Sequence, residues 1–433
     1  MNRRMIVLLL IFFIFIVVLI ISAIFSIKIL LFTTTILFLT LLLYYSLLTV
    51  AGLYNRLKQK ETPVLDHYPG VDILIPAHNE GVVIKETIEA MLSIKYPGDL
   101  QIYVLNDNSS DETAEIADAF AETFRNLHHI LVPPGEPRGK SRVLNYGLSI
   151  SENKYYCVYD ADNQPEPDAL VKLVATAETN TKAAGAVGYV RTLNEATNWL
   201  TRMISIEFQV FQLLMQSGRW QLFKTGSLTG TNMLVKRSVI EELGGYDPYA
   251  IAEDAELTLR ITREGYYLPI VPDSITWEQE PETLAVYLKQ RTRWLQGNLY
   301  IVEKTLTEPG YFKGKLLVHS IHQLLVYVVF WLFLLISYVW FALGILDIFY
   351  IEYTYPLLFI WYLAYMVYTS QLFAAQAAQR TFSPINIFVS VIMYFTYAQL
   401  FSYLFIRSLI SYIKAKKNRQ VIGWEKTTRF KSK

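Results

Sequence analysis

Two aspartates one residue apart follow an apolar run near the middle of the chain. Asp160 and Asp162 come directly after Tyr155-Tyr-Cys-Val-Tyr159. If extended geometry persists, both carboxylates face the same side of the chain, where two like charges repel. A divalent cation removes this repulsion, and Mg²⁺ or Mn²⁺ is usually held by one or two carboxylates together with substrate phosphates. The pair therefore indicates a metal–phosphate site, although Asp and Asn are also typical of a solvated turn.

Two later segments could also do chemistry. Glu253 and Asp254 open a predicted helix, where acids are favoured by the helix dipole and where one of them could act as a general base. In Gln290-Arg-Thr-Arg293-Trp294, residues Gln290, Arg293 and Trp294 share one helical face because they are spaced i, i+3 and i+4. Arginine can clamp a diphosphate and tryptophan can stack on a sugar, but the same pattern is typical of an amphipathic helix on a membrane surface.

Alternating strands and helices would position these residues. Strands are predicted at 71–76, 101–106, 129–132 and 155–159, with helices at 82–93, 112–124 and 139–151 between them. This order is typical of a mostly parallel α/β sheet with helices on both faces, whose ligands gather at the carboxyl ends of the strands. Ala77, Glu80, Asp107 and Asp160 follow three of these strands, so a nucleotide–metal site is expected there.

Composition indicates a membrane protein. Of 433 residues, 53% are hydrophobic, and the formal net charge of +1 gives no reason to expect a nucleic-acid partner. The single cysteine, Cys157, excludes an internal disulfide and a multi-thiol metal site. Residues 5–50 are long enough for two membrane helices, and basic residues flank both ends, which places both ends in the cytoplasm.

The C-terminal third contains three more apolar stretches, at roughly 321–349, 356–378 and 384–412. Three crossings from a cytoplasmic domain would leave the basic tail outside, against the positive-inside rule. One stretch is therefore expected to be interfacial, re-entrant or split. Polar side chains within these stretches either line a path or bond neighbouring helices, and they are His319, His322, Gln323, Gln371, Gln376, Gln379, Gln399 and Arg407.

The predicted organisation is that of a multi-pass plasma-membrane protein with a cytoplasmic catalytic domain. Its parts are a transmembrane hairpin at 1–54, the catalytic domain with interfacial helices at its end at 55–315, a transmembrane bundle at 316–412, and a basic cytoplasmic tail at 413–433.

In combination, the motifs resemble those of a known family. They are, in order, Pro76-x-x-Asn79-Glu80, Asn106-Asp107-x-Ser-x-Asp111, Asp160-x-Asp162, Glu253-Asp254 and Gln290-Arg-x-Arg-Trp294. The whole chain is similar to membrane-embedded family 2 glycosyltransferases, and most similar to processive synthases of poly-N-acetylglucosamine, cellulose, hyaluronan and chitin-type polymers. The resemblance implies a GT-A-type, Rossmann-like catalytic domain inserted between N-terminal and C-terminal transmembrane helices. It also implies a UDP-sugar donor and a Mg²⁺ or Mn²⁺ ion.

The resemblance also implies roles for individual residues. Asp254 would be the general base, with Glu253 beside it, and Asp160 and Asp162 would hold the metal. The donor would be bound by Ala77, Glu80, Asp107, Lys140, Asp160, Gln290 and Arg293, and the acceptor by Gly230, Thr231 and Trp294. A looser match suggests a gating segment with Trp424, Thr427 and Arg429. One departure is Ala252, which stands where the family usually has threonine.

The expected function is inverting transfer from UDP-N-acetylglucosamine or UDP-glucose, which elongates a β-linked exopolysaccharide and moves it across the bilayer. The expected partners are the donor, the growing polysaccharide, the lipid bilayer and small accessory membrane or extracellular export subunits. Two alternatives stay open. One is a non-processive synthase that transfers one or a few sugars to a lipid, and the other is a non-catalytic transporter or nucleotide sensor.

Overall fold

A mixed sheet is the centre of the computed structural model, which describes residues 27–58, 61–331 and 354–418 together with 334, 335, 337–339, 342 and 346. The strand order is β3-β2-β1-β4-β7-β6-β8-β5. β1 to β4 are parallel, as predicted, whereas β7 runs antiparallel between β4 and β6, and β5 antiparallel to β8. The strands are β1 (Val71–Ala77), β2 (Leu100–Asn106), β3 (Leu127–Leu131), β4 (Tyr155–Val158), β5 (Gln164–Pro165), β6 (Gly185–Thr192), β7 (Met233–Lys236) and β8 (Ile270–Glu278).

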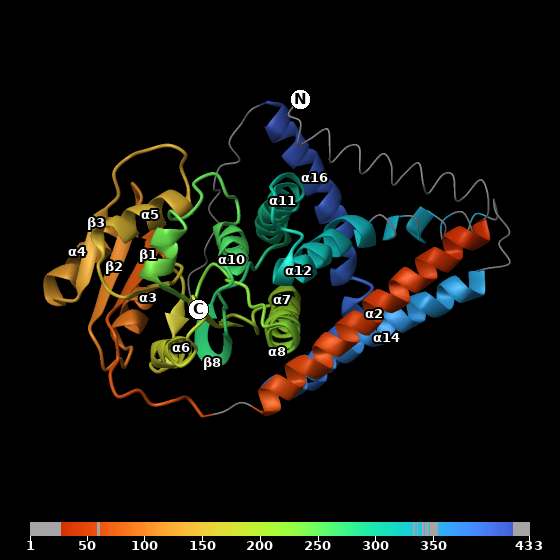
Figure 1. Cartoon of the computed structure of the whole chain (residues 1–433), viewed down its shortest axis with the longest axis horizontal. Helices are drawn as coiled ribbons and strands as arrows, with labels where there is room; N and C mark the ends of the chain where they lie inside the picture. Colours follow the sequence, from red (N-terminus) through yellow and green to blue (C-terminus); the bar gives the residue numbers. More distant parts are fainter. Residues whose placement is uncertain are drawn as a thin grey trace.

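Helices cover both faces of this sheet (Figure 1). Successive residues of β1 point to opposite faces, so Ile73 and Ile75 join one core and Leu74 the other. Because both faces are buried, β4 and the part of β1 that follows Asp72 are continuous apolar runs rather than alternating ones. One face packs on α3 (Ile84–Leu92), α4 (Thr113–Thr123) and α6 (Ala169–Glu178), and the other on α5 (Lys140–Ile150), α9 (Arg237–Glu242) and α10 (Glu253–Arg263).

A second group of helices lies between the sheet and two long apolar helices (Figure 1). It comprises α7 (Trp199–Gln209), the π-helical segment η1 (Val210–Gln216), α8 (Ser217–Phe223), α11 (Leu284–Thr307), α12 (Gly314–Leu324) and the π-helical segment η2 (Leu325–Phe330). The predicted Gln-Arg-x-Arg-Trp helix is the first half of α11.

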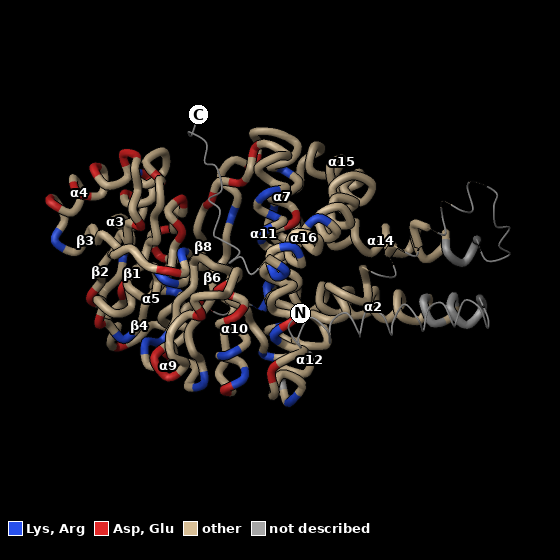
Figure 2. The backbone as a smooth tube through the Cα atoms, turned by 90° about the horizontal axis from the view of Figure 1, so that it is seen from above, with Lys and Arg blue, Asp and Glu red and all other residues tan. Residues whose placement is uncertain are grey.

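Two long apolar helices, α2 (Ile27–Leu57) and α14 (Thr354–Gln379), pack against each other and project from the sheet domain. Figure 2 shows that Lys, Arg, Asp and Glu are spread over the sheet domain and nearly absent from these two helices. The C-terminal ends of both helices reach the sheet: Arg56 contacts Asp273 of β8, and the hydroxyl of Tyr189 on β6 donates to Gln379 Oε1 at 2.6 Å. The first helix of the predicted hairpin lies outside the described residues.

By length and composition, three described helical segments could cross a membrane: Thr35–Leu57, Leu358–Gln379 and Pro384–Lys417. The last of these is broken, because α15 (Pro384–Met393) is separated from α16 (Leu400–Lys417) by a turn and the 3₁₀ helix η3 (Tyr397–Gln399). Both halves lie against the intermediate helices: α15 packs on α7, and α16 packs on α11, where Tyr412 donates to Glu303 Oε2 at 2.6 Å. The third apolar stretch is therefore split, which is one of the three arrangements expected from the sequence, and the number of membrane crossings stays a prediction.

Candidate active site

The loops that follow β1 and β2 are joined by hydrogen bonds. The backbone N–H of Asp107 donates to the Ala77 carbonyl at 2.8 Å. Asn79, in the left-handed region with φ of 56°, accepts from the Ser110 N–H at 2.7 Å, and its own N–H donates to Ser109 Oγ at 2.9 Å. Glu80 is buried beside this loop, so the predicted donor-binding residues Ala77, Glu80 and Asp107 lie together.

The first turn of α5 connects this loop pair to the acidic residues. Lys140 Nζ lies 2.6 Å from Asp160 Oδ1, 2.7 Å from the Gly230 carbonyl oxygen and 3.3 Å from Glu253 Oε1. Two residues along the helix, Arg142 contacts the carboxylate of Asp107. Arg142 was not among the predicted site residues, although its place in Arg138-Gly-Lys-Ser-Arg142, next to Lys140, was a signal for it.

The two aspartates of the metal motif do not share strand geometry, so that part of the sequence argument was wrong. β4 ends at Val158, and both aspartates lie in the turn that follows, closed by Asn163 N–H donating to the Asp160 carbonyl at 3.0 Å. The Asp160 side chain is 30% exposed, whereas Asp162 is buried. Thr231 holds the turn, because its hydroxyl accepts from the Asp160 N–H at 3.1 Å and donates to Asn163 Oδ1 at 2.9 Å.

Asp254 lies beside this turn at the start of α10. Gly230 has φ of +81°, and a Cβ added to it would stand 3.5 Å from Asp254 Oδ2 and 3.7 Å from Lys140 Nζ. Burial raises the pKa of Asp254 to about 7. The charge of Glu253 also raises this pKa, whereas the hydrogen bond from the Ala255 N–H and the charge of Lys140 lower it. Burial favours the neutral amine of Lys140, but Asp160 and Glu253 outweigh it and raise the pKa of Lys140.

The carboxylates of Asp160 and Asp162 fit a metal ion that takes few ligands from the protein. Within the described part of the chain, no three His, Cys, Asp or Glu side chains form a group that could hold a metal. Asp160 and Asp162 supply two carboxylates, and the exposed Asp160 leaves room for phosphate oxygens to complete the coordination shell of Mg²⁺ or Mn²⁺.

The aromatic and basic residues of α11 pack against α7. Trp294 stacks on Phe208 with ring centroids 6.2 Å apart, and the Arg291 guanidinium lies 4.5 Å from the Trp294 ring centre. Arg291 pairs with both oxygens of Glu207, at 2.5 and 3.2 Å, and so fixes α11 to α7. Gln290 is buried, while Arg293 and Trp294 are half-buried, and their predicted roles stay predictions. The predicted gating residues Trp424, Thr427 and Arg429 lie outside the described residues.

A close helix contact brings α11 to the start of α10. A Cβ added to Gly297 would stand only 2.6 Å from the Cβ of Ala252, two residues before Asp254. The small side chain at Ala252, which departs from the family pattern, suits this close approach.

Gly297→Ala is expected to push α11 away from Glu253 and Asp254, because two methyl groups would have to occupy the same space. Overpacking of this kind costs about 1–3 kcal/mol, so we expect a lower melting temperature and a roughly tenfold loss of transfer. Adding Ala252→Gly should restore both, since glycine is tolerated at a helix N-cap. Wild-type activity and melting in the single variant would contradict this contact.

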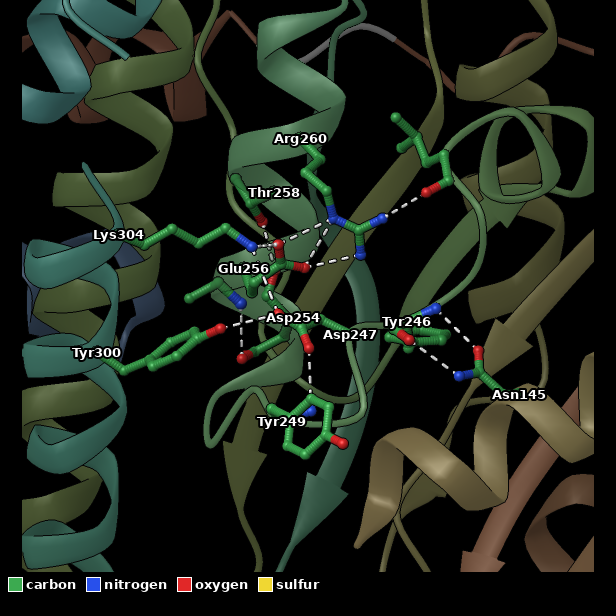
Figure 3. A network of polar contacts seen from close by, with 12 residues as sticks. Asn145, Tyr246, Asp247, Tyr249, Asp254, Glu256, Thr258, Arg260, Tyr300 and Lys304 are labelled. Carbon is green, nitrogen blue, oxygen red and sulfur yellow. Dashed lines mark hydrogen bonds and ion pairs between the residues drawn. The ribbon is translucent and has the colours of Figure 1, made fainter. Parts of the chain in front are cut away.

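A buried ionic network clamps the rest of α10 to α11 (Figure 3). Glu256, fully buried, accepts from Arg260 Nε at 2.9 and 2.8 Å and from Lys304 Nζ at 2.5 Å. Tyr300, one turn before Lys304 on α11, donates to Asp247 Oδ2 at 2.8 Å, and Lys304 lies 3.4 Å from the same oxygen. This network holds α10, and therefore Asp254, at a defined distance from the sugar-contacting face predicted on α11.

Lys304→Met is expected to loosen this clamp. Removing one partner of a buried pair typically costs about 3–5 kcal/mol, and the remaining Arg260 should reduce the loss to about 2–3 kcal/mol. Thermal unfolding of the purified protein in detergent measures it, with Lys85→Met, at an exposed pair with Glu89, as the matched control. Equal melting temperatures of the two variants would show that the network does not stabilise the α10–α11 contact.

Comparison with known proteins identifies this arrangement. The family described as glycosyltransferase-like family 2 matches residues 69–297 of this chain. This range includes every motif from Asn79 to Trp294. A Bacillus subtilis protein named probable glycosyltransferase YdaM is 40% identical over 366 residues, which cover 84% of this chain and 87% of that one. The chain belongs to glycosyltransferase family 2. The transferase is also 26% identical over 293 residues to a poly-β-1,6-N-acetyl-D-glucosamine synthase of Staphylococcus epidermidis, covering 67% of this chain and 70% of that one.

A solved structure supports the fold of the transferase. A mannosyltransferase from Pyrobaculum calidifontis, in complex with GDP-mannose and Mn²⁺, matches with a TM-score of 0.59 and 20% identity, covering 89% of this chain and 100% of that one. The predicted GT-A-type fold and the assignment as a glycosyltransferase are confirmed, so the alternative of a non-catalytic transporter or sensor falls away.

Proposed function

We propose that this transferase uses UDP-N-acetylglucosamine or UDP-glucose to extend a β-linked polysaccharide by inversion at the anomeric carbon. The observation that carries the proposal is the Asp254 carboxyl, whose pKa of about 7 suits a base at neutral pH and which lies beside the Lys140–Asp160 pair. Similarity to the S. epidermidis synthase favours N-acetylglucosamine over glucose.

We assign each part of the bound donor to different residues. Asp107, with Arg142 behind it, would receive the nucleoside, and the loop of Ala77 and Glu80 would lie next to it. Asp160 and Asp162 would hold Mg²⁺ or Mn²⁺, which when bound neutralises charge on the diphosphate. Lys140 keeps Asp160 and Glu253 oriented and adds a fixed positive charge at the same place.

The acceptor would enter from the α11 side. Its hydroxyl would donate its proton to Asp254 while its oxygen attacks the anomeric carbon and the UDP oxygen leaves on the opposite face, so that an α-linked donor yields a β-linkage. Trp294 would lie under the acceptor sugar, Gly230 and Thr231 would border it, and Gln290 and Arg293 would steady the leaving diphosphate.

The membrane helices support export of the product. α2 and α14 end at the sheet domain. Arg56 lies in the last turn of α2, and Lys414, Lys416 and Lys417 lie in the last turn of α16, which favours a multi-pass protein with a cytoplasmic catalytic domain. Small accessory subunits for export are part of the proposal only through the resemblance to polysaccharide synthases.

Purified full-length protein incubated with single UDP-sugars and Mn²⁺ or Mg²⁺ tests the proposal. We expect UDP release with one sugar above all, a ladder or smear of polymer on a gel, and loss of both with a metal chelator. A single glycolipid product would instead support the non-processive alternative, and release from GDP-sugars alone would overturn the donor assignment.

A further inference from the structure

Arg219 lies where α8 meets the membrane helix α2, and no described residue supplies an acidic partner for it. A Cβ added to Gly218 would stand 2.3 Å from the Leu48 carbonyl oxygen, and one added to Gly52 would stand 2.6 Å from the Leu214 Cα and carbonyl oxygen. α2 therefore touches both η1 and α8 backbone to backbone. Because Arg219 follows Gly218, this contact places it beside α2, about one turn from Tyr44 and Tyr45.

None of the described groups that interact electrostatically with Arg219 carries a negative charge. Its electrostatic partners are Tyr44 and Tyr45 of α2, His319 and His322 of α12, and Tyr327 of η2. These groups form a cluster, since the Tyr44 and His322 rings have centroids 5.6 Å apart. Among the residues that the structure describes, none forms a hydrogen bond or ion pair with Arg219, and both its Nε and the Tyr44 hydroxyl are buried without a partner.

Three other arginines that point into the protein each pair with an acidic residue. Arg237 pairs with Asp72 at 3.1 Å, Arg260 with Glu256 at 2.7 Å, and Arg291 with Glu207 at 2.5 Å. Arg219 is half-buried and its Nε is enclosed, so its charge is partly withdrawn from water without a counter-charge, and a guanidinium cannot lose its proton to escape that penalty. The contrast indicates that the counter-charge of Arg219 comes from a bound anion.

The surroundings of Arg219 favour a lipid as the source of that anion. α2 is a candidate membrane span, and Leu43 and Leu47, on either side of Tyr44 and Tyr45, are 61% and 52% exposed. Basic pockets between membrane helices are suited to anionic headgroups, which guanidinium recognises through paired hydrogen bonds. In addition, both π-helical segments, η1 and η2, border the cluster, and such segments occur frequently at functional sites.

We propose that Arg219, with Tyr44 and His322, binds the phosphate of an anionic lipid headgroup whose acyl chains lie along Leu43 and Leu47 of α2. The site is separate from the sugar-transfer residues and does not depend on the identity of the donor. Phosphate chemistry is shared by lipids and by free anions, so the test must tell the two sources apart.

Native mass spectrometry of the delipidated full-length protein in neutral detergent measures binding directly. The probes are palmitoyl-oleoyl phosphatidylglycerol, the matching diacylglycerol, which lacks phosphate, and inorganic phosphate. For the wild type, we expect at least tenfold tighter binding of phosphatidylglycerol than of diacylglycerol for the first lipid bound. Arg219→Gln should weaken phosphatidylglycerol binding about tenfold, whereas Arg219→Lys should retain part of it.

Arg407→Gln is the matched control, because Arg407 is exposed on α16 and carries the same charge. It should change phosphatidylglycerol affinity less than twofold. Equal wild-type affinity for phosphatidylglycerol and diacylglycerol would overturn the proposal without any variant. Binding of inorganic phosphate but not of phosphatidylglycerol would assign the site to a soluble anion and overturn the lipid assignment.

Discussion

Asp254→Asn is expected to lower the rate of sugar transfer at least ~10²-fold, because general-base catalysis typically contributes about 10²–10⁴. Asparagine has the same shape, so the short bond from the Ala255 N–H to the side-chain oxygen, now 2.7 Å, can persist. Melting temperature and UDP-sugar affinity should therefore change little. UDP release measured at saturating donor checks the rate, and Asp168→Asn, at an exposed acid paired with Lys172, is the control.

The pH dependence of the wild type provides a second readout of the same role. Because burial raises the pKa of Asp254 to about 7, the carboxyl is protonated at pH 5 and cannot accept a proton from the acceptor. The transfer rate should rise about tenfold per pH unit below pH 7 and level off above it. A flat profile between pH 5 and 8, or a sloping one that persists in Asp254→Asn, would rule Asp254 out as the base.

Lys140→Met is expected to reduce transfer by about two orders of magnitude. The substitution leaves Asp160 and Glu253 without the cation that lies 2.6 and 3.3 Å from them, and removes a positive charge from the predicted diphosphate site. Lys140 also lowers the pKa of Asp254, so its loss should move the alkaline plateau to higher pH. Initial rates measured across the pH range check both effects.

A neighbouring residue supplies the control for this prediction. Arg138→Met removes a positive charge from the same loop, but the Arg138 side chain is 84% exposed and pairs only loosely with Glu136, at 3.4 Å. It should leave the rate within about twofold. If Lys140→Met and Arg138→Met behaved alike, Lys140 would be one of several surface charges rather than part of the site.

Local patterns were sufficient to predict the first half of the sheet. β1, β2 and β4 are short apolar runs that stop at polar residues, and each lies within one residue of its predicted bounds. The helix that begins at Glu253 and the one that carries Gln290 to Trp294 were also predicted, because helix periodicity and dipole preferences act over a few residues.

The second half of the sheet was not predicted in detail. β7 is four residues long, and nothing in Met233–Lys236 indicates that it inserts antiparallel between β4 and β6. Strand pairing of this kind depends on residues far apart in the chain, so propensity and alternation do not determine it. The antiparallel insertion matters for the site, because it carries the loop of Gly230 and Thr231 to Lys140 and Asp160.

Side-chain type and short-range spacing were enough to predict which chemical groups the transferase offers and at which strand and helix ends they lie. The ion pairs became visible only in the folded structure. They join Lys140 to Asp160 and Glu253, Arg142 to Asp107, and Glu256 to Arg260 and Lys304. The tertiary structure also decided that Arg219 is half-buried with no acidic partner among the described residues. The physical reason is that burial and long-range contact set the energy of a charge, and neither is visible until the chain has folded back on itself.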